Sequence, residues 1–386
     1  MNFELAEEQL MLRAMARRFA EEEMLPTLKE YERQRKVNYD VIKKMGELGL
    51  IGPHLPQEYG GAGLDYTSAA IIWEQLSWAS WTQALVSMGH GVLAGTIIMS
   101  AATEEQKQKY LPDIASGKRL AAFALTEPTA GSDASAIKTT AERVKGGYVI
   151  NGTKQFITNG GEAEIYTVIA LTDKARGARG ASAFLVEKDT PGFSFGKKEK
   201  KMGIRASSTR ELVFRNCLVP EENLIGKEGM GFIVTLKLLD RSRPGIGAQA
   251  VGLAQGALEA AVDYARKRIQ FGHPIISLPV VQNMLADMAI NVEASRALTY
   301  AVARTIDSGA KNFTEEAAMA KVFASDIAMK VTTDAVQIFG GVGYMRDYPI
   351  EKMMRDAKIT QIYEGSNEVL RSTIAFELRK RKARRE

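Results

Sequence analysis

The chain has 386 residues, 45% hydrophobic and 25% charged, which excludes a disordered, collagen-like or small disulfide-stapled protein. The one cysteine, Cys217, excludes an intrachain disulfide, and the three histidines (His54, His90 and His273) include no helix-spaced pair, so no metal site is expected. Taken alone, the formal net charge of +5 would suit a nucleic-acid or anionic membrane partner.

Residues 1–118 are predicted to form a helical domain. Apolar residues recur at helical spacing from Leu5 to Phe19, and Pro26 is expected to end that helix. The start of the chain has no signal-peptide or transit-peptide pattern, so a bacterial cytoplasmic location is expected. Further helices are expected over Tyr39–Leu48, Thr67–Trp78, Gln83–Met99 and Thr103–Ser116, the last with a capping box of Thr103 and Gln106.

Residues 119–230 are predicted to form a β domain, because the pattern changes there to alternation with period two. Asn151-Gly152 between two alternating segments predicts a hairpin turn, since both turn residues need a positive φ. Strands are also expected over Ile165–Leu171, Ala181–Val186 and Glu211–Cys217. No helix separates them, which favours an antiparallel barrel or sandwich over a parallel sheet.

Residues 231–386 are predicted to form a helical bundle that ends in a basic tail. Long helices are expected over Ala248–Lys267, Val280–Ile306, Glu315–Phe339 and Ile350–Lys358. No apolar stretch is expected to span a membrane, because the most apolar ones fall short of about 20 residues. The last eight residues hold six of the 51 basic residues and one of the 46 acidic ones, so the rest is neutral and no nucleic-acid partner is expected.

Glycines within the bundle allow two interpretations. Gly245 to Ala250 reads G-x-G-x-x-A, like a dinucleotide-binding fingerprint, but no strand precedes it and no acidic residue closes a βαβ unit. Close helix packing is therefore the favoured interpretation. The glycines at Gly340, Gly341 and Gly343 suit either a helix C-cap or a backbone that approaches a cofactor.

Two loops are candidates for chemistry. Phe123 to Asp133 runs from a strand into a turn whose hydroxyls and backbone N–H groups suit a polar ligand, although an ordinary Pro-Gly turn has the same pattern. Glu364 lies between Tyr363 and Gly365, where apolar neighbours raise a carboxyl pKa towards the range of a general base. A lone loop glutamate is more often simply solvated.

Together, in order and spacing, these segments resemble the acyl-CoA dehydrogenase family over residues 3–378. The motifs that carry the resemblance are LTEPTAGSD at 125–133, NGTKQFITNG at 151–160, RIQFGHPI at 268–275, VQNMLADM at 281–288, QIFGGVGY at 337–344 and RDAKITQIYEGSNEV at 355–369. The resemblance implies a mostly α fold with a central antiparallel β domain and a C-terminal bundle. It also implies an FAD cofactor and a homo-oligomer, expected to be a homotetramer.

The resemblance further implies α,β-dehydrogenation of an acyl-CoA thioester to a 2-enoyl-CoA. Glu364 matches the base that removes the α-proton while the β-hydride passes to flavin N5, and electrons pass on to an electron-transfer flavoprotein. The alternative position for the base on the helix near 242 holds Ser242, which cannot serve. Alternatives are an enoyl-CoA reductase running the reverse reaction, an acyl-CoA oxidase, or a non-catalytic flavin-binding scaffold.

By the same resemblance, a set of residues matches FAD contacts: Phe123, Leu125, Thr126, Ser132, Phe156, Ile157, Thr158, Arg268, Phe271, Gln282, Gln337, Gly340, Gly341, Ser366 and Glu368. Arg268 and the matches from Phe271 to Gly341 are expected to reach the FAD of a neighbouring subunit. The substrate matches are Ser132, Asp240, Arg243 and Gly365.

The acyl group is less predictable from the sequence. The helix around Gln83–Leu93 lacks the arginine that holds a distal carboxylate in glutaryl-type relatives, so that specificity is not expected. Chain length stays open. Ser87, His90 and Gly91 are unusual at this place and raise the hypothesis of a non-linear acyl group.

Overall fold

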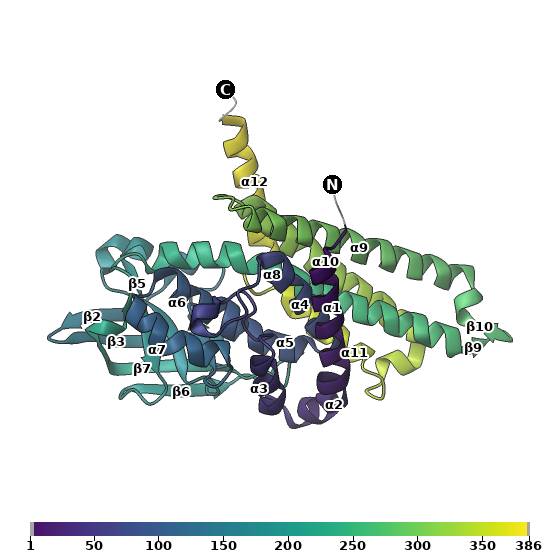
Figure 1. Ribbon diagram of the computed structural model, residues 1–386, viewed down its shortest axis with the longest axis horizontal. Coiled ribbons are helices and arrows are strands. Elements are labelled where there is room, and N and C mark those ends of the chain that lie inside the picture. Colours follow the sequence, from purple (N-terminus) through teal and green to yellow (C-terminus); the bar gives the residue numbers. More distant parts are fainter. Residues whose placement is uncertain (1–3, 384–386) are drawn as a thin grey trace.

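The protein, described here over residues 4–383 of a computed structural model, is elongated, with the large sheet at one end and the long helices extending to the other, where a small hairpin lies (Figure 1). Before the first strand come α1 (Glu7–Phe19), α2 (Leu25–Gln34), α3 (Tyr39–Glu47), α4 (Tyr66–Ala79), α5 (Trp81–Ser87), α6 (Thr96–Ala101) and α7 (Glu104–Ala115). The expected order of helices, a β region and helices again is confirmed.

The first helix does not end at Pro26. A π-helical turn, η1 (Ala20–Met24), joins α1 to α2, and Pro26 lies in the first turn of α2. The Leu25 N–H donates to the Ala20 carbonyl, five residues back. The wider π turn thus accommodates a proline that would clash with the carbonyl four residues earlier in an α-helix.

The predicted helix over Gln83–Met99 is likewise interrupted by a π-helical segment, η3 (Met88–Gly95), between α5 and α6. Together, α5, η3 and α6 form the stretch Trp81–Ala101, which by length and composition could cross a membrane, contrary to the sequence-based expectation. However, 78% of the tested window is buried inside the protein, as in a core helix. The capping box of Thr103 and Gln106 at the start of α7 is confirmed.

Strands β1 to β8 form one mainly antiparallel sheet, in the order β6-β7-β3-β2-β4-β5-β8, with β1 parallel to β4. Their bounds are β1 Ala121–Ala124, β2 Thr140–Val144, β3 Gly147–Thr158, β4 Ile165–Leu171, β5 Ala181–Glu187, β6 Phe193–Lys198, β7 Thr209–Pro220 and β8 Leu224–Ile225. Cys217 is fully buried in this sheet, and burial raises the pKa of its thiol to about 11, consistent with a small core side chain.

The predicted hairpin turn at Asn151-Gly152 is wrong. Both residues lie inside the continuous strand β3, and the turn that joins β2 to β3 is Lys145-Gly146. The register of β3 with β7 shifts between Ile150 and Gly152, and Asn151 Oδ1 accepts the Asn216 N–H at 2.7 Å. The glycine is needed for a different reason, because a Cβ there would lie 2.5 Å from Thr139 Oγ1.

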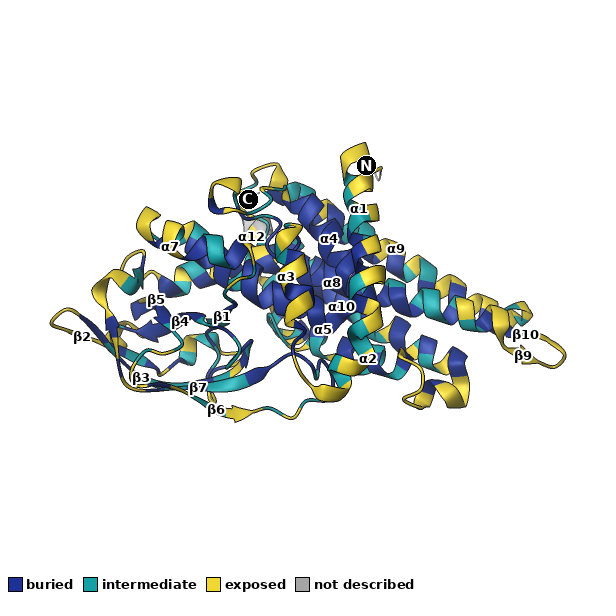
Figure 2. Cartoon of the chain, turned by 60° about the horizontal axis from the view of Figure 1, so that its bottom comes forward, coloured by how far each residue is buried: buried dark blue, intermediate teal, exposed yellow. Residues whose placement is uncertain are grey.

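The C-terminal helices are α8 (Gly231–Lys267), α9 (Pro279–Asp307), α10 (Thr314–Phe339), α11 (Ile350–Lys358) and α12 (Asn367–Ala383), with a small hairpin of β9 (Ile269–Gln270) and β10 (His273–Pro274) after α8. The rings of Tyr264 and Phe339 stack with centroids 4.2 Å apart, so α8 and α10 are parallel and their C-terminal ends meet. Figure 2 shows buried residues concentrated where α4, α8 and α10 cross.

The glycines of α8 serve close packing, as predicted. A Cβ on Gly245 would lie 2.9 Å from Met88 Cε, and one on Gly252 would lie 2.0 Å from the Glu74 carbonyl oxygen. The backbone of α8 therefore approaches α4 and η3 more closely than any side chain would allow.

Candidate active site

Glu364 lies in the short loop between η9 (Ile359–Gln361) and α12, beneath the middle of α8. Its Oε2 accepts a hydrogen bond from Ser242 Oγ at 2.7 Å, and its carbonyl oxygen accepts from Arg243 Nε at 3.4 Å. Its φ of 58° is left-handed, a conformation that costs energy in a non-glycine residue. Two consecutive residues of α8 therefore hold this strained glutamate by its side chain and its backbone.

Burial raises the pKa of the Glu364 carboxyl above its ordinary value. The hydrogen bond from Ser242 and the positive charges of Arg243 and Lys321 act in the opposite direction. A carboxylate that is partly dehydrated yet still favoured in its ionised form by nearby donors is suited to act as a general base.

The predicted substrate residues on α8 lie next to this glutamate. Arg243 is buried, and its Nη1 lies 2.6 Å from Asp240 Oδ1. Asp240 Oδ2 in turn accepts from Thr314 Oγ1 at 2.6 Å. A Cβ on Gly365 would lie 3.8 Å from Arg243 Nη2, so Asp240, Arg243 and Gly365 converge on one side of the base.

The loop after β1 is tethered by a buried ion pair that the sequence analysis did not identify. Lys154 Nζ lies 2.7 Å from Glu127 Oε1 and donates to the Leu125 carbonyl at 2.9 Å. The Glu127 carboxylate also accepts the backbone N–H groups of Lys138 and Thr139. Both side chains are almost fully buried, so the loop that carries Thr126 and Ser132 has a fixed conformation.

The end of β3 lies beside this loop, because the Gln155 N–H donates to the Thr126 carbonyl at 2.8 Å. Phe156 is 58% exposed with φ 59°, an unusual state for a large apolar side chain, whereas Ile157 is buried. A Cβ on Gly89 would lie 3.1 Å from Thr158 Cγ2, so the strand end packs on η3. On its other side, η3 contacts α8 through Met88, one turn from Ser242. Because η3 contacts both α8 and the end of β3, the loop after β1, β3 and Glu364 lie in one region.

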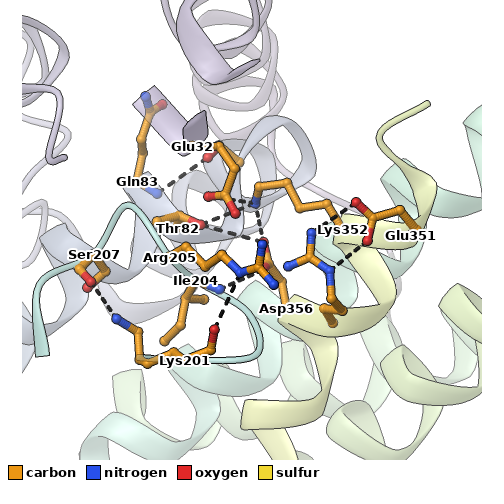
Figure 3. A network of polar contacts seen from close by, with 12 residues as sticks. Glu32, Thr82, Gln83, Lys201, Ile204, Arg205, Ser207, Glu351, Lys352 and Asp356 are labelled. Atoms are coloured by element: carbon orange, nitrogen blue, oxygen red, sulfur yellow. Dashed lines mark hydrogen bonds and ion pairs between the residues drawn. The ribbon is translucent and has the colours of Figure 1, made fainter. Parts of the chain in front are cut away.

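A network of polar contacts joins α11 to the rest of the protein (Figure 3). Asp356 Oδ1 accepts the Ile204 N–H at 2.6 Å, and Oδ2 accepts from Lys352 Nζ and, at 3.5 Å, from Thr82 Oγ1. These partners come from α11, from α5 and from the loop between β6 and β7. The network therefore fixes the helix that leads directly into the Glu364 loop.

The remaining predicted FAD residues lie elsewhere. Arg268 follows α8, 26 positions beyond Ser242, which corresponds to about 39 Å along a helix. The exposed residues Arg268, Phe271, Gln282, Gln337, Gly340 and Gly341 gather at the end of the bundle where α8 and α10 meet. Gly340 has φ 64°, and a Cβ on Gly340 or Gly341 would meet no described atom within 4 Å. This group is thus open to a partner and remote from the Glu364 of its own chain.

Ser366 and Glu368 have local contacts that explain them without a ligand. The Val369 N–H donates to Ser366 Oγ at 3.4 Å, and Glu368 is exposed in the first turn of α12. Both side chains thus suit the positive end of the helix dipole. Their contacts to FAD stay a prediction.

The hypothesis of a non-linear acyl group loses its basis. His90 is fully buried, its Nε2 lies 2.6 Å from the Ile114 carbonyl, and its Nδ1 accepts the Ala121 N–H at 2.7 Å. Burial lowers the pKa of this imidazole to about 4. Gly91 faces the Ile51 carbonyl, and Ser87 Oγ donates to its own helix. All three residues pack inside the protein for structural reasons.

Three family models match successive parts of the chain: the N-terminal domain of acyl-CoA dehydrogenase over residues 6–118, its middle domain over 122–217 and its C-terminal domain over 229–378. The chain belongs to the acyl-CoA dehydrogenase family. The expected enzyme class, an oxidoreductase of this family, and the expected fold class are therefore confirmed.

Relatives within the acyl-CoA dehydrogenase family align over nearly the full chain. The short-chain specific acyl-CoA dehydrogenase of Clostridium acetobutylicum is 47% identical over 97% of this chain and 99% of its own. The acryloyl-CoA reductase (NADH) of Anaerotignum propionicum is 48% identical over 99% of this chain and 97% of its own.

Solved structures of the same family superpose closely. A chain from the structure described as electron transferring flavoprotein of Acidaminococcus fermentans gives a TM-score of 0.96 at 51% identity, covering 98% of this chain and 99% of that one. Butyryl-CoA dehydrogenase from Megasphaera elsdenii gives 0.95 at 44% identity, with coverages of 98% and 100%. Acyl-CoA dehydrogenase complexed with FAD from Bacillus anthracis gives 0.92 at 38% identity, with coverages of 98% and 69%.

FAD is the cofactor of this acyl-CoA dehydrogenase family, and the residues present fit it. Phe156 offers an exposed aromatic face of the kind that packs against a flat ring. Within the described residues, the hydroxyls of Thr126 and Ser132 have no hydrogen-bond partner, so they are available to a polar ligand. The loop that carries both hydroxyls is held by the buried pair of Lys154 and Glu127.

Proposed function

We propose that this enzyme dehydrogenates a short-chain acyl-CoA thioester to the 2-enoyl-CoA, with Glu364 as the base that removes the α-proton. The observation that carries the proposal is the Glu364 carboxylate itself, which is partly buried, hydrogen-bonded to Ser242 and part of a residue held in a left-handed conformation. Ordinary solvation or helix capping explains none of these features, whereas a general base benefits from a fixed position and a raised pKa.

The chain also supplies a donor for the thioester oxygen. An α-proton next to a thioester is only weakly acidic, so its removal needs a carbonyl polarised by fixed donors. The N–H of Glu364 makes no hydrogen bond among the described residues and is free for that purpose. When bound, FAD supplies the acceptor for the β-hydride, and the protein's part is to orient and enclose the reactants.

The CoA end of the substrate is assigned to residues of α8, and the length of its acyl end is proposed from the relatives. Asp240 and Arg243 form a partly buried pair on the Glu364 side of α8, where Arg243 suits a polar part of the CoA moiety. The short acyl chain is proposed from the relatives described as short-chain specific and as butyryl-CoA dehydrogenase.

The reverse reaction is the second candidate function. The relative described as an acryloyl-CoA reductase is as similar to this chain as the dehydrogenases are. The same base and donor serve both directions, because the α-proton returned to the product comes from Glu364. Measuring both half-reactions, with butyryl-CoA on the oxidised protein and acrylyl-CoA on the reduced protein, decides which is faster.

An electron-transfer flavoprotein is proposed as the electron acceptor, supported by the close match to a chain in the Acidaminococcus structure.

A homo-oligomer, expected to be a homotetramer, is proposed from the exposed group at the end of the bundle. Phe271 is 86% and Tyr344 80% exposed there, which is uncommon for aromatic residues on a free surface.

The main test is anaerobic bleaching of the yellow flavin band by butyryl-CoA. The wild type is expected to bleach, and Glu364→Gln is expected to retain FAD but not to bleach. Glu105→Gln, an exposed glutamate on α7, serves as the control and is expected to behave as wild type. Full bleaching of the Glu364→Gln protein would exclude Glu364 as the base.

A second test addresses the contact between subunits. Arg268→Ala is expected to lose FAD and oligomer stability together upon dilution, because a guanidinium fork at the pyrophosphate is removed. Arg266→Ala, two residues earlier on the same exposed turn, is the matched control. Unchanged flavin content of the Arg268→Ala protein at low concentration would contradict the proposed contact.

A further inference from the structure

Lys321 is a fully buried lysine in the middle of α10, among small and apolar neighbours. Its Nζ donates to the Gly365 carbonyl at 2.7 Å and to Asn367 Oδ1 at 2.9 Å. Both hydrogen-bond partners are neutral. A long flexible side chain normally carries its ammonium to water, so a lysine kept inside at such cost needs a compensating role.

The ends of the Glu364 loop are held without Lys321. Asp326 Oδ1 accepts from Gln361 Nε2 at 2.7 Å before the loop and from Asn367 Nδ2 at 2.8 Å after it. Ser325 Oγ also accepts from Asn367 Nδ2, at 2.9 Å. What Lys321 adds, besides its hydrogen bond to Asn367 Oδ1, is the contact to the carbonyl of Gly365, the residue that directly follows the base.

That peptide lies in the most constrained part of the loop. Glu364 and Gly365 have φ values of 58° and 95°, so two consecutive residues are left-handed. Arg243 Nε from α8 donates to the Glu364 carbonyl, and Lys321 Nζ from α10 donates to the Gly365 carbonyl. The two cations, one from α8 and one from α10, thus hold the successive carbonyls of Glu364 and Gly365 and fix the backbone that carries the glutamate.

We propose that Lys321 is a positioning residue for the α-proton base, holding the carbonyl of Gly365, the residue after Glu364, and placing a positive charge at the loop that carries the base. This inference rests on the proposed function, because it presupposes that Glu364 acts as the base. Lys321 itself is placed in contact with the loop backbone and not with the substrate.

The charges around the pair are few. Glu364 is faced by Ser242 and Arg243 on α8, by Lys321 on α10 and by the phenols of Tyr66 on α4 and of its neighbour Tyr363. Lys321 is faced by Glu364, Arg243, Asp326 and Glu368. Burial lowers the pKa of Lys321 to about 7, and the carboxylate of Glu364 opposes that change, so each group favours the charged form of the other.

The test is the pH dependence of anaerobic flavin reduction by butyryl-CoA in the holoenzyme. Lys321→Met removes both the charge and the donor. Its acid limb is expected to move up by about one pH unit, with a rate loss of roughly tenfold on that limb, because the charge of Lys321 lowers the pKa of the Glu364 carboxyl and its removal lets that pKa rise. The KM for butyryl-CoA is expected to stay within about twofold, because Lys321 does not contact the substrate.

Lys321→Gln separates the two roles, because an amide can donate to the Gly365 carbonyl without carrying a charge. It is expected to show the same displaced acid limb with a plateau rate closer to wild type, and it also serves as the test protein should the Met variant not fold. Lys330→Met, on the same helix but 51% exposed and paired with Asp334, is the matched control and is expected to keep the wild-type profile.

The outcomes are distinguishable. An unchanged acid limb in both Lys321 variants would overturn the inference, and so would a loss of FAD or of folding stability without any displacement of the limb, since that is what a purely structural lysine would give. If the wild-type holoenzyme itself is not bleached by butyryl-CoA, the proposed function fails instead.

Discussion

The buried pair of Lys154 and Glu127 allows a sharp prediction about stability. Lys154→Met removes the cation and leaves the Glu127 carboxylate with only its two backbone donors, at 2.6 and 3.0 Å. Breaking a buried pair by removing one partner costs about 3–5 kcal/mol. The two remaining N–H donors reduce that penalty, whereas the lost hydrogen bond to the Leu125 carbonyl adds about 1 kcal/mol. We therefore expect a loss of about 3–4 kcal/mol.

The measurement is urea unfolding of the holoprotein, with FAD release followed in parallel by flavin fluorescence. In the Lys154→Met protein, FAD is expected to dissociate at a lower urea concentration than that at which the helices unfold, because the lost pair tethers the loop that carries Thr126 and Ser132. Lys174→Met is the control. Its partner Glu142 lies 3.4 Å away, but both side chains are well exposed, so a change below about 0.5 kcal/mol is expected.

A double variant tests the electrostatic reasoning. Glu127→Gln combined with Lys154→Met removes both charges, and its loss is expected to be smaller than the sum of the two single losses by about 2 kcal/mol. Additive losses would show that the two side chains stabilise the loop independently. A loss below about 1 kcal/mol for Lys154→Met alone would show that water already reaches the carboxylate.

Three further predictions concern stability. Glu364→Gln is expected to stabilise the protein near pH 7. Burial raises the pKa of the Glu364 carboxyl, so the folded state binds this proton more tightly than the unfolded state. The stability of the wild type therefore falls as pH rises above about 4.3 towards the raised pKa, by about 1.4 kcal/mol for each unit of pKa difference. Thermal melts at pH 4 and pH 7 check this, and an equal difference at both would contradict it. Gly252→Ala is expected to lose about 1–3 kcal/mol in urea unfolding, because its Cβ would lie 2.0 Å from the Glu74 carbonyl; an unchanged midpoint would mean that the helices separate freely. Asp356→Asn is expected to lose about 2–4 kcal/mol, because Lys352 stays buried with only the more distant Glu32 carboxylate, 3.9 Å away, and restoration by Lys352→Met in the same chain would support that cause.

The helices could be predicted well, because a 3.6-residue apolar pattern in long segments leaves few alternatives. Ile350–Lys358 is observed with the predicted bounds, whereas α8 begins 17 residues before the predicted Ala248. Pro244 and two nearby glycines concealed the continuity of α8, since local propensity opposes a helix there and only packing against α4 and η3 favours it.

The misplaced hairpin has a similar cause. Asn151-Gly152 has the local chemistry of a turn, but the register between β3 and β7, whose residues Asn151 and Asn216 are 65 positions apart, converts it to an irregularity within a strand. The actual turn, Lys145-Gly146, was not predicted, because Asn-Gly is the stronger local turn signal. Long-range pairing decides such cases, and no local pattern reports it.

The candidate site divides in the same way. Glu364 could be found because the motif at 355–369 resembles that of the family, whereas its local pattern alone favoured a solvated glutamate. Lys321 could not, because a single lysine in a helix of mixed residues normally indicates an exposed face. Lys154 and Glu127 could not be found either, because they are 27 positions apart and only the fold shows that their charges pair in a buried place.

The buried stretch Trp81–Ala101 has a consequence for the newly made chain. Until α4, α7 and β1 cover this stretch, the newly made chain exposes 21 consecutive residues that are as apolar as a membrane span. Variants that loosen its packing are therefore expected to be lost to aggregation and proteolysis before they are lost to impaired catalysis. Low yield of such a variant would then report on this segment and not on the chemistry of Glu364.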